Sequence, residues 1–84
     1  MNVMYFSTQW CGPCKMFKPV VQEVSQELGI PVQYIDAQQN PDAAQKYSIS
    51  SVPTIVITDD SDNVQFKNTG VLSKISLKAA LARF

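Results

Sequence analysis

Both cysteines of the chain lie in one short segment, Trp10–Lys15, with the sequence WCGPCK. The apolar stretch Val3–Phe6 before it predicts a strand, and the amphipathic pattern after it predicts a helix. The first sulfur, on Cys11, would therefore lie at a helix N-terminus, where free backbone N–H groups and the helix dipole favour a thiolate. Cys14 follows about one turn later on the same face, close enough for a disulfide. This spacing indicates a site for thiol–disulfide exchange.

The two thiols are expected to have different roles. Cys11, at the helix start, should be the more exposed and more acidic thiol and so the attacking nucleophile. It would form a mixed disulfide with a substrate, and Cys14 would then attack Cys11 and release the reduced substrate. Gly12 and Pro13 between them stiffen the loop.

Other uses of the cysteine pair are less favoured. A purely structural disulfide closing so short a loop would constrain the unfolded chain by only ~2 kcal/mol. A structural zinc site usually needs four ligands, and the chain has two cysteines and no histidine. We therefore expect no metal, and redox chemistry is the preferred interpretation; an intermolecular half-site stays open.

Composition narrows the class of protein further. The 84 residues suit one small domain, 1–84, and the seven basic residues balance the seven acidic ones. The sequence has no basic patch that would indicate nucleic-acid binding. No apolar run reaches the length of a membrane span. A strand is expected within a residue or two of Met1, leaving no room for a signal peptide. A cytoplasmic protein is the default expectation.

The hydrophobic pattern predicts four strands and three helices in the order β-α-β-α-β-β-α. The strands are expected at Val3–Phe6, Val32–Asp36, Thr54–Thr58 and Val64–Lys67. The helices are expected from Pro13 to Leu28 before Gly29, from the cap Asn40 to about Tyr47, and after the cap Ser73, with Leu77, Ala80, Leu81 and Phe84 facing inward. Two βαβ-like crossovers, a hairpin and a final helix predict an α/β fold: a four-stranded mixed sheet with helices on both faces.

The WCGPCK segment resembles the active-site signature of thioredoxins, including the flanking Trp10 and Lys15. The predicted element order resembles the core of the thioredoxin fold without the extra N-terminal strand and helix of most members. The resemblance implies a monomeric protein-disulfide reductase with no cofactor. It would act on disulfide-containing proteins and be recharged by thioredoxin reductase or a similar dithiol donor.

The resemblance also implies a substrate groove beside the cysteines. Pro53 would be cis and lie next to the sulfurs, and Val52 would offer backbone groups to an extended substrate chain. Gly70 would let that chain approach, and Trp10 would form an exposed aromatic wall. The simpler interpretations are an ordinary turn proline, a turn glycine with positive φ, and a partly buried tryptophan.

Two positions depart from the family pattern. Tyr5 occupies the place where thioredoxins usually carry a buried aspartate, and the lysine that pairs with it would fall at Tyr34. Cys14 would then lack a proton acceptor, so we expect slower exchange at acidic pH than in an aspartate-bearing member, unless Tyr5 is simply a core aromatic. The charge of Lys15 would favour the Cys11 thiolate only weakly, because an exposed lysine is well screened.

Two alternative functions stay open. A glutaredoxin-like protein would use glutathione. Glutaredoxins, however, typically carry Cys-Pro-Tyr-Cys and a Gly-Gly or Gly-Asp-like turn near the last helix. Here Gly12-Pro13 separates the cysteines, and Val71 follows Gly70. In the other alternative, the fold serves as a non-catalytic binding subunit of a larger assembly. Replacing both cysteines with serine separates this from catalysis, because binding should survive the change.

Overall fold

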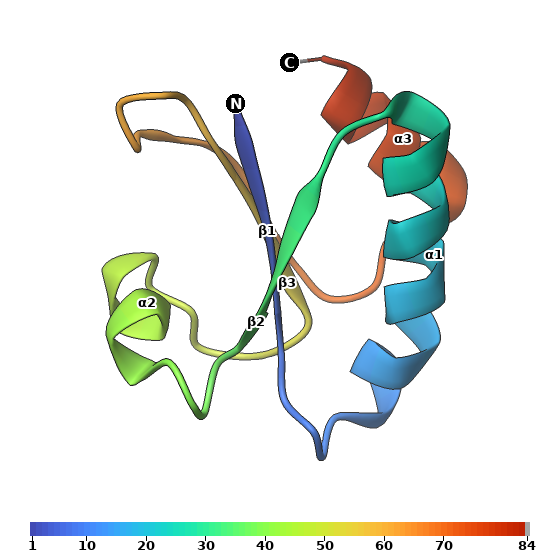
Figure 1. The fold of residues 1–84 in the computed structure, drawn as a ribbon. Helices are drawn as coiled ribbons and strands as arrows, with labels where there is room; N and C mark the ends of the chain where they lie inside the picture. The colour runs from blue at the N-terminus through green and yellow to red at the C-terminus, as the bar shows by residue number, and fades with distance from the viewer. Residues whose placement is uncertain (84) are drawn as a thin grey trace.

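The computed structural model describes residues 1–83, which form four strands and three helices (Figure 1). They are β1 (Asn2–Ser7), α1 (Gly12–Leu28), β2 (Val32–Asp36), α2 (Pro41–Lys46), β3 (Thr54–Thr58), β4 (Val64–Thr69) and α3 (Lys74–Ala82). The predicted order β-α-β-α-β-β-α is confirmed. The inward position predicted for Phe84 lies outside the described residues.

The sheet has the strand order β2-β1-β3-β4. Strands β1 and β2 pair in parallel, whereas β3 is antiparallel to both β1 and β4. The expectation of two βαβ-like crossovers was therefore wrong for the second one. The short helix α2 does not carry the chain back along the sheet: Asp36 at the end of β2 pairs with Ser7, and Thr54 at the start of β3 pairs with Phe6. The connection therefore stays at one end of the sheet, and β3 starts there.

Helices cover both faces of the sheet, as predicted (Figure 1). On one face, α1 and α3 pack over a core that includes Phe17, Val21, Leu77 and Leu81. On the other face, residues of α2 and the loops beside it cover a smaller cluster of Met4, Phe6 and Val56. Because side chains of a strand alternate between faces, β1 and β3 contribute to both clusters. This explains why all five residues of β3 are buried.

Local sequence signals explain the element ends. Gly29 ends α1 in the left-handed conformation (φ 65°) that glycine adopts without strain. Pro41 lies in the first turn of α2, but the Asn40 side chain makes no capping bond and donates instead to the carbonyl of Asp36. Before α3, Ser73 Oγ accepts from the backbone N–H of Ser76, as its predicted capping role requires.

Replacing Ser73 with alanine should lower the free energy of unfolding by about 1 kcal/mol, because the helix loses the acceptor for one free N–H group. Urea denaturation measures the change. Ser73→Asn is the matched control, since asparagine can supply the same acceptor and should retain most of the stability. Equal losses in the two variants would contradict the capping role.

Candidate active site

The two cysteines lie where the chain leaves the central strand β1 and enters α1. Cys11 is the N-cap of α1 and is joined by a disulfide to Cys14, with their Cα atoms 5.2 Å apart. The Cys14 backbone N–H donates to Cys11 Sγ over 3.1 Å. Such an N–H group stabilises negative charge on sulfur, which is the property that a thiolate nucleophile needs. The predicted pairing and the predicted helix-start position of Cys11 are both confirmed.

The burial of the two sulfur-bearing residues is unequal. Cys14 is only 3% exposed, whereas Cys11 is partly exposed. The predicted difference in exposure is confirmed. A substrate sulfur can therefore approach Cys11 from solvent. Cys14 is buried and is positioned to react with Cys11.

The loop before β3 lies at the same end of the sheet as the disulfide. Because β3 is antiparallel to β1, its first residue Thr54 pairs with Phe6, near the end of β1. The Val52–Pro53 peptide bond is cis, as predicted, and Pro53 is buried. Val52 is half-buried.

The chain after β4 returns to the same place. Gly70 has a φ of 105°, a conformation that L-residues with a side chain rarely adopt. Its N–H donates to the carbonyl of Pro53 over 2.8 Å. This bond ties the two loops together, and sequence reasoning missed it because the residues are far apart in the chain. The simpler interpretation of Gly70, a turn glycine with positive φ, is confirmed.

Two large apolar side chains are exposed near this end of the sheet. Trp10 is 78% exposed, so the alternative that it is partly buried in the core was wrong. Val71, after Gly70, is 56% exposed. Gly12, Pro13 and Lys15 are also exposed at the start of α1. An apolar surface beside a reactive sulfur suits contact with another protein chain.

Tyr5 lies beneath the disulfide, in the middle of β1. It is fully buried, and its hydroxyl donates to the backbone carbonyl of Cys14 over 2.8 Å. Burial, and secondarily the neighbouring Tyr34, raise the pKa of Tyr5 to about 12. Tyr34 is opposite Tyr5 in the β1–β2 pairing, as the sequence comparison with the family predicted. It is 41% exposed, however, so only one residue of the pair is buried.

The thioredoxin family model matches residues 1–83 of the chain. The chain belongs to the thioredoxin family. Its Cys11–Cys14 pair is the redox centre of a thiol–disulfide oxidoreductase, because the chain folds as thioredoxins do and carries their paired cysteines at the start of α1.

Thioredoxins of known sequence and structure support this membership. The chain is 37% identical to the thioredoxin of Buchnera aphidicola subsp. Acyrthosiphon pisum over 78 residues, 90% of this chain and 71% of that protein. It is 40% identical to Bacillus subtilis thioredoxin over 62 residues, which are 71% of this chain and 60% of that protein. A thioredoxin mutant from Halobacterium salinarum NRC-1 superposes with a TM-score of 0.91 at 29% identity, covering 99% of this chain and 73% of that one.

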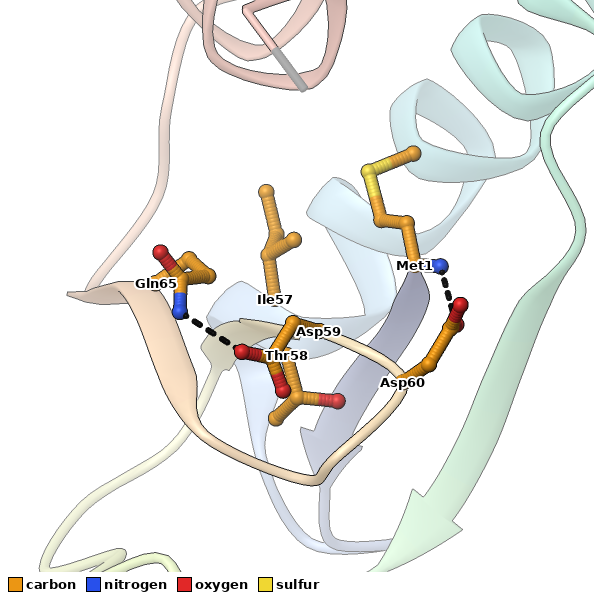
Figure 2. A pocket seen from close by; sticks show the side chains of 6 residues that line it. All are labelled: Met1, Ile57, Thr58, Asp59, Asp60 and Gln65. Atoms are coloured by element: carbon orange, nitrogen blue, oxygen red, sulfur yellow. Dashed lines mark hydrogen bonds and ion pairs between the residues drawn. The ribbon is translucent and has the colours of Figure 1, made fainter.

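A pocket lies at the opposite end of the sheet from the thioredoxin redox centre. It has a volume of about 300 Å³ and is lined by Met1, Ile57, Thr58, Asp59, Asp60 and Gln65 (Figure 2). Two pairs of polar groups bond there, since Gln65 donates to Asp59 and the Met1 amino group pairs with Asp60, whereas the buried Thr58 Oγ1 has no hydrogen-bond partner. The end of β3 that lines it pairs with the start of β1. The pocket therefore does not contribute to the redox site.

Two further findings concern residues 1–83. No group of three or more histidine, cysteine or acidic side chains there is arranged to hold a metal ion. No helix in the same range is both long and apolar enough to cross a membrane.

Proposed function

We propose that the chain is an electron carrier that reduces disulfides of protein substrates and is recharged by thioredoxin reductase or a similar dithiol donor. The observation that carries the proposal is the placement of a partly exposed Cys11 at the start of α1, bonded to a buried Cys14. We also propose that it acts as a single-domain monomer in the cytoplasm, with no metal or organic cofactor.

The proposed reaction transfers two electrons from the dithiol to the substrate. The Cys11 thiolate attacks one sulfur of the substrate disulfide, and the other substrate sulfur leaves as a thiolate. The Cys14 thiolate then attacks Cys11 Sγ, so the Cys11–Cys14 bond forms and the bond to the substrate breaks. The substrate leaves with both sulfurs reduced, each taking up a proton.

The same end of the sheet offers a place for the substrate chain. We propose that Val52 pairs through its backbone with an extended substrate segment, which Pro53 and Gly70 allow to approach the sulfurs. Trp10, Gly12 and Pro13 would contact the substrate on the other side. This assignment is supported by the Gly70–Pro53 hydrogen bond, which holds the two loops together, and by the 78% exposure of Trp10.

The reduction potential of the Cys11–Cys14 couple tests the proposal. We expect a value near the thioredoxin figure of about −270 mV, measured in buffers of defined dithiol-to-disulfide ratio. A value near about −180 mV would instead favour the glutathione-linked, glutaredoxin-like alternative. Absence of a reversible couple would overturn the proposal and leave the binding-subunit alternative.

The doubly substituted chain, Cys11→Ser with Cys14→Ser, is the control. It should fold and lose all reduction of a disulfide-bonded test protein. If it retained that activity, the cysteine pair would not be the reductant.

A further inference from the structure

The Tyr5 hydroxyl joins the central strand to the first turn of α1. It donates over 2.8 Å to the carbonyl oxygen of Cys14, the residue that must close the disulfide. Tyr5 is 0% exposed, so no water competes for this hydrogen bond. The bond is thus placed at the one residue whose position relative to Cys11 matters for ring closure.

The ring of Tyr5 is held on two sides. Phe17 of α1 and Tyr34 of β2 both meet it edge-on, each with ring centroids 5.8 Å away. The raised pKa of about 12 keeps the hydroxyl protonated at neutral pH. Tyr5 therefore remains a hydrogen-bond donor in this range and cannot take the proton of Cys14. Its contribution must come from position rather than from acid–base chemistry.

The hydrogen bond from Tyr5 to Cys14 matters most in the reduced protein. While the disulfide is closed, the covalent bond itself holds Cys14 beside Cys11. Once the disulfide opens, it no longer restrains the first turn of α1. That turn has fewer backbone hydrogen bonds than the helix interior, so it depends more on its remaining contacts. The Tyr5 hydrogen bond does not involve sulfur and can persist in both redox states.

We infer that Tyr5 is a positioning residue for Cys14, which raises the effective concentration of the Cys14 thiol at Cys11 and favours the intramolecular disulfide over the mixed disulfide. This inference rests on the proposed redox function. The step affected is the second one: the Cys14 thiolate attacks Cys11 Sγ, the Cys11–substrate bond breaks, and the substrate thiolate departs. The Cys14 proton passes to solvent or to that thiolate, so no further oxidant or base is required.

Tyr5→Phe tests the inference, because it removes the hydroxyl and keeps the ring. Glutathione buffers of known composition would give the equilibrium constant for closing the disulfide. We expect this constant to fall about three- to tenfold, as for loss of one buried hydrogen bond. The potential would then become less negative by roughly 14 to 30 mV. Mass spectrometry should also find more of the mixed disulfide between Cys11 and glutathione.

Tyr47→Phe is the matched control. The Tyr47 hydroxyl donates to Asp62, between the end of α2 and the β3–β4 turn, and takes no part in the redox site. Its loss should leave the potential unchanged. An unchanged potential in Tyr5→Phe, or an equal shift in both variants, would overturn the inference. A wild-type chain without a reversible couple would refute the proposed function itself.

A measurement on the wild-type protein removes the dependence on how well the variant folds. The hydroxyl proton of Tyr5 should exchange slowly with solvent in NMR spectra of both the oxidised and the reduced protein. Rapid exchange confined to the reduced form would show that the bond to Cys14 is lost when the disulfide opens, and the inference would be wrong.

Discussion

Replacing Cys14 with serine is expected to stop the reaction at the mixed disulfide. Cys11 keeps its position at the start of α1 and can still attack a substrate. A serine hydroxyl cannot displace a sulfur from a disulfide, so the second step is lost. We expect turnover of a disulfide-bonded test protein to fall below detection, while a covalent complex with that protein accumulates. Non-reducing electrophoresis and intact-mass measurement detect the complex.

The matched control is Cys11→Ser, which leaves Cys14 as the remaining thiol. Because Cys14 is only 3% exposed, a protein substrate should not reach it, and no comparable complex should form. Equal trapping by the two variants would contradict the assignment of Cys11 as the attacking residue. Release of reduced product by Cys14→Ser would contradict the resolving role of Cys14.

Replacing Phe17 with alanine should cause a large loss of stability. Phe17 is fully buried between α1 and the sheet, and its ring packs edge-on against Tyr5. Removing a buried phenylalanine ring typically lowers the free energy of unfolding by about 3–5 kcal/mol, through lost apolar burial and the cavity left behind. Small domains have only about 5–15 kcal/mol in total. Urea denaturation of the oxidised protein measures the change.

Met16→Ala is the control for this prediction. Met16 is the preceding residue of α1 but is 78% exposed, so its truncation should change stability by less than about 0.5 kcal/mol. Similar losses in the two variants would show that the core does not depend on Phe17 as the packing indicates. An unchanged midpoint for Phe17→Ala would show the same.

The elements and the redox pair could be predicted from the sequence because their signals are local. Cys11 and Cys14 are three residues apart, so a helix beginning between them is enough to bring their sulfurs together. Periodic apolar residues indicated the strands and helices, and Gly29 and Ser73 indicated where two helices end and begin. Each of these signals acts within a few residues of the chain.

The tertiary structure alone decided the direction of β3 and the contacts that depend on it. An apolar run such as Ile55–Ile57 predicts a buried strand but does not say which neighbour it pairs with or in which direction. The family resemblance implied that Pro53 lies near the sulfurs, but only the antiparallel pairing with β1 explains that position and the bond that Gly70 makes to Pro53 there. The hydrogen bond from Tyr5 to Cys14 likewise depends on how α1 packs on the sheet. Such contacts follow from burying all the apolar faces at once, which no local pattern specifies.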